Sequence, residues 1–180
     1  MRVTGGIYCR RLVDCPPGDI RPSMDRMRES VFAVLGDLTG CSFLDLFSGS
    51  GIIGIEAASR GASPVLLVER DRGKRRTILS NIAMVESSIT LVTAPVEGYL
   101  GSASTAFDIV FLDPPFAHAD KPALVRAVFQ GGHVREGGLV LIHLPSEEEM
   151  EPDLAGLEIA DRRQYGRSLV QFFRFAGRSG

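Results

Sequence analysis

The feature that most constrains this chain is a series of short apolar runs separated by segments with helical periodicity. The runs cover residues 42–47, 64–69, 89–92, 107–113 and 138–144. Their apolar residues are largely consecutive rather than alternating, which is typical of strands buried on both faces of a parallel sheet. Helices are expected between them, at 52–60, 71–85, 96–100 and 122–129. The order predicts an α/β fold with a doubly wound, mostly parallel sheet.

The N-terminal region precedes the first apolar run and leads into a helix. Its first 20 residues are predicted to form a hairpin or extended arm that turns at Gly5-Gly6. Ser23 is the expected N-cap of the following helix. The buried stripe of that helix is expected to be Met27, Val31, Val34, Leu35 and Leu38. We therefore divide the chain into an arm over residues 1–22 and one larger domain over 23–180.

The C-terminal region departs from the alternation of strand and helix. Residues 157–164 and 168–175 are two strand-like runs joined by Tyr165-Gly166-Arg167. They predict a hairpin that ends the sheet with an antiparallel strand. The nearby phenylalanines are expected to pack in the core rather than to stack on bases; they are Phe172, Phe173 and Phe175.

Composition excludes several classes of protein. A chain of 180 residues with 44% hydrophobic and 23% charged residues fits one globular domain. It has no apolar run of the roughly 18–20 residues that a membrane span needs, and its start does not look like a signal peptide. Its three cysteines and three histidines lack ligand spacing. We expect a cytoplasmic protein with reduced thiols, no metal site and no membrane association.

Charge is unevenly distributed along the chain. The net charge is −2, yet residues 1–30 carry six arginines against four acidic residues. Residues 162–180 carry five arginines and no acidic residue, whereas residues 147–161 carry seven acidic residues and no basic one. Two basic ends on one face would form a patch suited to a nucleic acid. The alternative is charge scattered over a solvated surface.

A glycine-rich loop after the first apolar run indicates a cofactor site. Residues 49–54, GSGIIG, match the pattern GxGxxG between a strand and a helix. Glycines let the backbone approach a ligand, and the helix N-terminus offers free N–H groups. Glu69 ends the second apolar run, where a carboxylate can accept hydrogen bonds from both ribose hydroxyls. This combination predicts a nucleoside-containing cofactor.

Asp45 helps to decide between a nicotinamide dinucleotide and S-adenosylmethionine. It lies inside the first apolar run, four residues before Gly49. A carboxylate there suits a ligand that carries an ammonium and a sulfonium better than it suits a pyrophosphate. The alternative is a structural aspartate that bonds only to loop amides.

A rigid turn follows the fourth apolar run. It reads Asp113-Pro114-Pro115-Phe116, at the edge of an open α/β sheet where ligands bind. Two prolines fix the backbone and remove two N–H donors, so the turn displays carbonyl oxygens. The Asp113 carboxylate and the Pro114 carbonyl can both accept from a planar amino group, while Phe116 stacks on its ring. We expect these four residues to catalyse transfer to an aromatic amine.

The chain resembles the bacterial 16S ribosomal RNA guanine-N2 methyltransferases. Residues 20–32, IRPSMDRMRESVF, are similar to that family's RPTTDRVRE-LF signature. Further similar blocks are LDLFSGSG at 44–51, ERD at 69–71, FDIVFLDPPF at 107–116 and Tyr165-Gly166. The resemblance implies a Rossmann-like class I methyltransferase fold, S-adenosylmethionine as the cofactor, and 16S rRNA of the small ribosomal subunit as the partner. A monomer is the default expectation for the oligomeric state.

The resemblance also assigns residues. The cofactor contacts that it implies, together with the loop analysis, are Asp45, Phe47, Ser48, Gly49, Ser50, Gly51, Glu69, Arg70 and Val96. The expected RNA contacts are Arg21, Ser23, Arg26 and Arg167. A capping network with Asp25 and Glu29 is the alternative role for Arg21 and Arg26.

Two positions depart from the family pattern. Ala94-Pro95-Val96 stands where the family usually has an aspartate near the adenine, which leaves backbone groups or Glu97 for that task. The hairpin reads Gly166-Arg167-Ser168 instead of Gly-Asp-Thr.

Three other functions remain open from the sequence. They are adenine-N6 methylation of DNA or another RNA, a nicotinamide-dependent dehydrogenase, and an RNA-binding module without catalysis. The sequence does not identify the guanosine, nor whether naked rRNA or an assembled subunit is the substrate.

Overall fold

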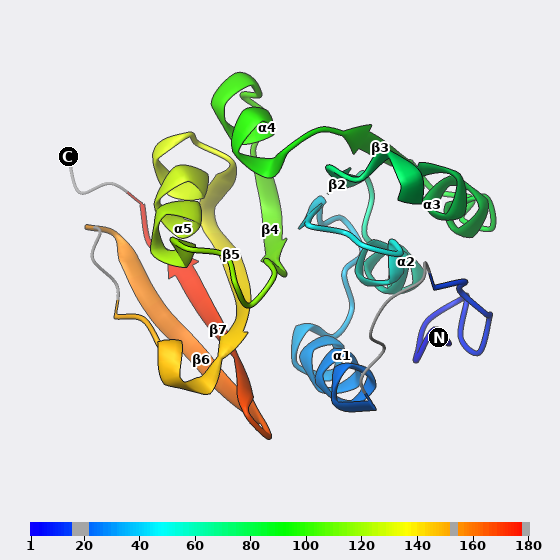
Figure 1. Ribbon diagram of the computed structural model, residues 1–180, viewed down its shortest axis with the longest axis horizontal. Helices are drawn as coiled ribbons and strands as arrows, with labels where there is room; N and C mark the ends of the chain where they lie inside the picture. Colours follow the sequence, from blue (N-terminus) through cyan, green and yellow to red (C-terminus); the bar gives the residue numbers. More distant parts are fainter. Residues whose placement is uncertain (16–21, 152–154, 178–180) are drawn as a thin grey trace.

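The structure is a computed structural model that describes residues 1–15, 22–151 and 155–177. A seven-stranded sheet with the order β3-β2-β1-β4-β5-β7-β6 forms its centre (Figure 1). The strands are β1 (Phe43–Leu46), β2 (Val65–Glu69), β3 (Ile89–Thr93), β4 (Phe107–Leu112), β5 (Val134–Pro145), β6 (Leu157–Tyr165) and β7 (Ser168–Phe175). Strands β1 to β5 are parallel, while β7 is antiparallel to both β5 and β6. The predicted parallel sheet with a terminal hairpin is confirmed.

Helices cover both faces of the sheet and create two apolar cores. The helices are α1 (Pro22–Leu35), α2 (Ile52–Ser59), α3 (Arg75–Ile82), α4 (Val96–Ser102) and α5 (Lys121–Gln130), with short 3-10 turns η1 (Arg72–Lys74) and η2 (Ser146–Glu148). Helices α1, α2 and α3 share one core with the N-terminal arm. Helices α4 and α5 share the other, on the opposite face (Figure 1). No helix in the described ranges is long and apolar enough to cross a membrane.

The arm, residues 1–15, folds back on itself and packs against α2. A bridge pairs Arg2 with Leu12, and the side chains of Val3, Tyr8 and Val13 are buried in the α1–α3 core. The predicted turn at Gly5-Gly6 lies against Ser59 of α2. Gly6 has a φ of +76°, and a Cβ there would lie 1.9 Å from the Ser59 carbonyl oxygen, so only glycine fits. The boundary expected at residue 22 stays a prediction, since residues 16–21 lie outside the described ranges.

A buried ionic cluster, here called the Glu56 clasp, fastens the arm to α1 and α2. The Glu56 carboxylate is fully buried and accepts hydrogen bonds from Thr4 N at 2.7 Å, Thr4 Oγ1 at 3.0 Å and Arg28 Nε at 3.0 Å. It also pairs with Arg60, and Arg28 Nη2 donates to the Arg2 carbonyl oxygen at 2.8 Å. The arm is thus continuous with the core in its packing and its hydrogen bonding.

Helix α1 differs from its predicted form in two ways. It begins at Pro22, so Ser23 lies in the first turn and is not the N-cap. A proline suits this position because the first N–H of a helix has no partner to lose. The helix ends at Leu35, so Leu38 lies beyond it, and Val34 is 41% exposed. Phe32 takes the buried place that was expected for Val34.

Two of the C-terminal arginines, both on β6, form ion pairs with acidic residues. Arg162 pairs with Glu149 at 2.7 Å and with Glu151 at 3.0 Å. Arg163 pairs with Asp161 at 2.8 Å. The acidic stretch before the hairpin therefore neutralises these arginines of β6.

The hairpin packs as expected, although β5 is longer than its apolar run. Phe172 and Phe173 of β7 are buried, and the ring of Phe175 meets that of Phe129 edge-on at 5.5 Å between centroids. The prediction that these rings are packing residues is confirmed. Strand β5 begins at Val134 because it pairs there with Phe107, before its apolar run starts.

Candidate functional site

Four polar side chains follow the apolar residues that point into the α1–α3 core. The buried residues of β2, β1, β4 and β5 on this face include Leu67, Phe43, Phe111 and Leu141. Side chains on a strand alternate between faces, so the residue two positions further points the same way. Those residues are Glu69, Asp45, Asp113 and His143. They line one face at the carboxyl ends of four neighbouring strands, where ligands bind in open α/β sheets.

Asp45 is the deepest of the four. Its side chain is fully buried; Oδ2 accepts from Gly54 N at 3.1 Å, and no described group bonds to Oδ1. Burial raises the pKa of this carboxyl well above its usual range, and the nearby Asp113 and Glu69 charges raise it further. Gly54 must lack a side chain because a Cβ there would lie 2.2 Å from Leu67 Cδ2. The free oxygen is suited to a cationic group, which a purely structural aspartate would not need.

Glu69 ties the end of β2 to the glycine-rich loop. Its Oε2 accepts from Gly49 N at 2.9 Å and its Oε1 accepts from Asp71 N at 2.9 Å. Gly49 and Gly51 have φ values of +58° and +83°, in the left-handed region that favours glycine. Each Glu69 oxygen keeps one acceptor position for a hydroxyl group.

The rest of the loop is held by its neighbours. Phe47 has a φ of +65°, and its ring meets the His118 ring edge-on at 5.8 Å. Ser48 Oγ donates to the Val68 carbonyl oxygen at 3.1 Å. The Ser50 carbonyl oxygen accepts from Asn81 Nδ2 at 2.9 Å. The loop path is therefore set by contacts within the protein.

The last two expected cofactor residues occupy different environments. Arg70 is exposed just after β2. Val96 is the first residue of α4 and is buried in the α4–α5 core, with Pro95 before it. Both lie at the carboxyl edge of the sheet.

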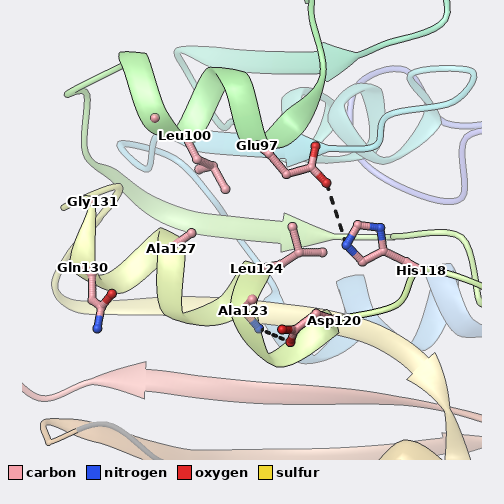
Figure 2. Close-up of a pocket in the computed structure, with 10 residues that line it drawn as sticks. Glu97, Leu100, His118, Asp120, Ala123, Leu124, Ala127, Gln130 and Gly131 are labelled. Carbon is pink, nitrogen blue, oxygen red and sulfur yellow. Dashed lines mark hydrogen bonds and ion pairs between the residues drawn. The ribbon is translucent and has the colours of Figure 1, made fainter.

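A cavity of about 480 Å³ opens between α4 and α5, beside Val96 (Figure 2). Its apolar wall includes Leu100 and Leu124. At its mouth, Glu97 Oε1 lies 3.8 Å from His118 Nε2, and the Glu97 side chain is 59% exposed. Glu97, the carboxylate that follows Val96 in the sequence, thus already faces His118.

Asp113 begins the rigid turn after β4. Its N–H donates to the Leu46 carbonyl oxygen at 3.2 Å, and Oδ1 lies 2.9 Å from His143 Nδ1. The Pro115 carbonyl oxygen accepts from His118 N at 2.8 Å and closes the turn. No described donor binds Asp113 Oδ2 or the Pro114 carbonyl oxygen. Two acceptors are therefore free at the edge of the sheet.

Phe116 stands exposed beside these acceptors. It is 38% exposed, and its ring meets the His143 ring edge-on at 5.4 Å. Lys121, whose side chain is buried, donates to the carbonyl oxygens of Phe116 at 2.7 Å and His118 at 3.1 Å. It also pairs with Glu148 at 2.7 Å. This lysine fixes the backbone that carries the aromatic ring.

His143 and Lys121 are residues of the site that sequence reasoning missed. The sequence indicated only that the three histidines lack ligand spacing, and it gave His143 no role. Its position, two residues after Leu141 in the fifth apolar run, was visible, but its contact with Asp113 depends on the register between β4 and β5. Lys121 carried no signal, because its partners are backbone carbonyls of a turn.

The expected RNA contacts are only partly described. Arg26 is exposed on α1, and Asp25 pairs with Arg28 at 3.0 Å rather than with Arg26. Arg167 is exposed in the β6–β7 turn, and its carbonyl oxygen accepts from Ser146 N at 3.1 Å, next to the end of β5. Ser23 lies in the first turn of α1, and Arg21 lies outside the described residues.

Comparison with known proteins now identifies the family. The model of the family described as "Conserved hypothetical protein 95" matches residues 1–174. The chain belongs to this family.

Its relatives are methyltransferases by name. Ribosomal RNA small subunit methyltransferase D of Escherichia coli is 31% identical over 158 residues, which are 86% of this chain and 77% of the relative. "Putative rRNA methyltransferase YlbH" of Bacillus subtilis is 30% identical over 184 residues, covering 98% of this chain and all of the relative. The solved structure "Putative methyltransferase yhhF from Escherichia coli" superposes with a TM-score of 0.89 at 27% identity, covering 98% of this chain and 99% of that one. This member of the family is a methyltransferase with a Rossmann-like fold.

The structural neighbour "Crystal structure of SMU.776, a putative methyltransferase complexed with SAH" superposes with a TM-score of 0.72 at 18% identity, covering 86% of this chain and 50% of that one. The residues of this site fit S-adenosylmethionine, the cofactor expected from the sequence. The buried, unpartnered Asp45 Oδ1 can take its ammonium group. The Glu69 oxygens can accept from its ribose, and the glycines at 49 and 51 let the backbone approach it. A pyrophosphate beside the Asp45 carboxylate would be repelled, which disfavours a nicotinamide dinucleotide.

Proposed function

We propose that this methyltransferase acts on the exocyclic N2 amino group of a guanosine in 16S rRNA of the small ribosomal subunit. Two relatives that cover most of the chain are named as rRNA methyltransferases, one of them for the small subunit. The protein works as a monomer in the cytoplasm, where small subunits assemble.

The observation that carries the proposal is the pair of free acceptors in the turn after β4. Asp113 Oδ2 and the Pro114 carbonyl oxygen have no described donor, and the exposed Phe116 lies beside them. An aromatic amino group has two hydrogens that these acceptors can take while Phe116 stacks on its ring. The target base must leave its own stack to reach them, and the phenylalanine replaces part of that stacking.

The chemistry follows from these contacts. The cofactor supplies a methyl group on a sulfonium when bound. Two acceptors that draw on the amine hydrogens favour the pyramidal geometry in which the nitrogen lone pair can attack. As the new N–C bond forms and the S–C bond breaks, the amine must lose one proton, and the Asp113 carboxylate is placed to accept it. Pro115 keeps the turn rigid throughout.

Guanine suits Asp113 better than adenine does. The ring nitrogen next to the amino group of guanine carries a hydrogen, so an ionised carboxylate can accept from both groups. In adenine that nitrogen carries a lone pair, which would face the carboxylate at a cost of about 1–3 kcal/mol for the buried mismatch. Methylation of adenine N6 in DNA or another RNA is the alternative outcome.

The RNA is proposed to follow the edge of the sheet from α1 to the hairpin. Arg26 of α1 and Arg167 of the β6–β7 turn are both exposed. Helix α1 contacts the end of β6 next to that turn, where the Tyr165 hydroxyl donates to Ser30 Oγ at 2.8 Å. Arginine suits phosphate because its planar fork can donate two hydrogen bonds. Arg21 and Ser23, in the same signature as Arg26, complete the proposed contact.

The test uses small subunits from a strain that lacks this activity. The full chain and labelled S-adenosylmethionine are incubated with these subunits and, in parallel, with naked 16S rRNA. Digestion to nucleosides and mass spectrometry then identify the product. N2-methylguanosine that is absent with Asp113→Asn supports the proposal.

The other results each have a clear meaning. N6-methyladenosine would replace the proposal by its alternative, and no methylated nucleoside from either substrate would overturn both. Calorimetry with NAD and S-adenosylmethionine checks the cofactor separately, and saturable binding of NAD alone would exclude methyl transfer.

A further inference from the structure

We propose that His143 is a positioning residue for methyl transfer, which holds the Asp113 carboxylate so that its second oxygen meets the target amine. The inference rests on the proposed function and adds to its site a residue that acts through Asp113.

The geometry places His143 between the two groups expected to meet the base. Its Nδ1 lies 2.9 Å from Asp113 Oδ1, and its ring meets the Phe116 ring edge-on at 5.4 Å. The residue is 5% exposed and belongs to the middle of the sheet, between β4 and β7. Loss of this ring would therefore free both the carboxylate and the phenylalanine.

The chemistry of the pair fixes the tautomer. An ionised carboxylate can only accept a hydrogen bond, so the hydrogen of the neutral imidazole lies on Nδ1. The remaining nitrogen, Nε2, then carries a lone pair. It is buried and has no hydrogen-bond partner among the described residues. His143 is thus anchored through Asp113 alone.

This anchoring separates the tasks of the two Asp113 oxygens. Oδ1 receives the imidazole hydrogen, while Oδ2 and the Pro114 carbonyl oxygen remain for the amine. A carboxylate without such a donor rotates about its last bond, and both oxygens then sample unproductive positions. The hydrogen bond from a fixed ring removes that freedom before the base arrives.

The elements around β5 on this face carry other titratable or charged groups. These are Asp45 on β1, the Arg28–Glu56 pair of α1 and α2, Tyr165 and the Arg163–Asp161 pair on β6, and the Lys121–Glu148 pair. Strand β7 places the apolar Val170 opposite His143. None of these side chains bonds to the imidazole in the described structure.

Two substitutions separate the hydrogen bond from the shape of the ring. His143→Phe keeps an aromatic ring in the same buried position but removes the donor. His143→Asn restores an amide N–H close to the place of Nδ1 and does not titrate. Steady-state kinetics with RNA and S-adenosylmethionine are measured for the wild type and both variants.

The expected result is a change in kcat without a change in binding. His143→Phe lowers kcat about 10- to 100-fold, the loss typical of one hydrogen bond to a charged group, while KM for RNA and cofactor stays nearly constant. His143→Asn recovers most of kcat. Nitrogen-15 shifts of the wild-type imidazole report a hydrogen on Nδ1.

His133 provides the matched control. It is another buried histidine, next to the amino end of β5, with Nε2 2.9 Å from the Leu100 carbonyl oxygen and Nδ1 unpaired. His133→Phe is expected to change stability but not kcat.

The failures are distinguishable. An active wild type with unchanged kcat in His143→Phe, no recovery of kcat in His143→Asn, or a hydrogen on Nε2 instead of Nδ1 would overturn this inference alone. A wild type without any methylation would overturn the proposed function and this inference with it.

Discussion

At the carboxyl ends of the strands, the carboxylates on the β1–β2 side and the carboxylate on the β4–β5 side are held by different kinds of hydrogen bond. On the β1–β2 side, Glu69 and Asp45 accept from the backbone N–H groups of Gly49, Asp71 and Gly54. On the β4–β5 side, the Asp113 carboxylate is bound by a side chain, that of His143. A backbone-held carboxylate organises a loop, so changing it alters the loop and the ligand site together. A carboxylate held by a side chain can be altered with little effect on the fold around it.

The largest effect that this contrast predicts is for Asp113→Asn. The substitution keeps the size of the side chain but removes the charge that accepts the amine proton. We expect kcat to fall by about 10²- to 10⁴-fold, the usual contribution of a positioned proton acceptor, with S-adenosylmethionine affinity nearly unchanged. Single-turnover methylation and calorimetry measure the two quantities. A parallel loss of cofactor affinity would mean that the β4–β5 side of the site cannot be altered without changing the β1–β2 side.

Glu69→Ala is expected to have the opposite signature. It removes hydrogen bonds to a charged acceptor from both the loop and the ribose, so cofactor binding weakens by about 1.5–3 kcal/mol. Calorimetry measures this loss, and Glu97→Ala is the control because that side chain is 59% exposed and faces His118. If Glu97→Ala weakened binding as much, Glu97 would take part in adenine recognition.

The pH dependence of the stability of Asp45→Asn tests the β1–β2 side. Burial raises the pKa of Asp45 above its usual 3.8 in the folded protein, so the folded state binds more protons than the unfolded state. The stability that the folded state gains from binding this proton is fully present below the pKa of the unfolded state. It is lost as the pH rises through the raised pKa of the folded state. Without cofactor, Asp45→Asn should therefore gain stability relative to wild type as the pH rises toward neutrality. Urea unfolding at several pH values measures the unfolding free energy of Asp45→Asn minus that of the wild type, and a difference that falls as the pH rises would contradict the prediction.

The smallest effects are expected at the rim, where exposed arginines meet RNA. Arg26→Ala and Arg167→Ala should each reduce the slope of log K against log salt by about one unit, for one lost phosphate contact. Arg163→Ala is the matched control, since Asp161 already neutralises that arginine. Filter binding across a salt series gives the slopes. An equal change in the control would indicate general surface charge rather than defined contacts.

The same contrast explains what could be predicted from the sequence. Asp45, Glu69 and the glycine-rich loop are local patterns that require only the order of strand, loop and helix. The Asp113 turn is equally local. His143 was missed because its partner is 30 residues away and only the β4–β5 register brings them together.

The error in α1 and the charge pairing at the C-terminus, which the sequence left open, both depend on tertiary contacts. Periodicity could not locate the end of α1 at Leu35, so Val34 was expected to be buried. The pairing of Arg162 with Glu149 and Glu151 likewise depends on how the chain before β6 folds back along that strand.

The Glu56 clasp has a consequence for the heat-capacity change on RNA binding. A loose arm that ordered on contact would lose about 1–2 kcal/mol of backbone entropy per residue fixed. Here Thr4 already gives two hydrogen bonds to Glu56, and lifting it away would leave a buried carboxylate with two donors fewer. Residues 1–15 are therefore folded before any partner arrives. An RNA that contacts the exposed Arg10 or Arg11 binds a surface that is already ordered. Its association should therefore lack the large negative heat-capacity change of coupled folding.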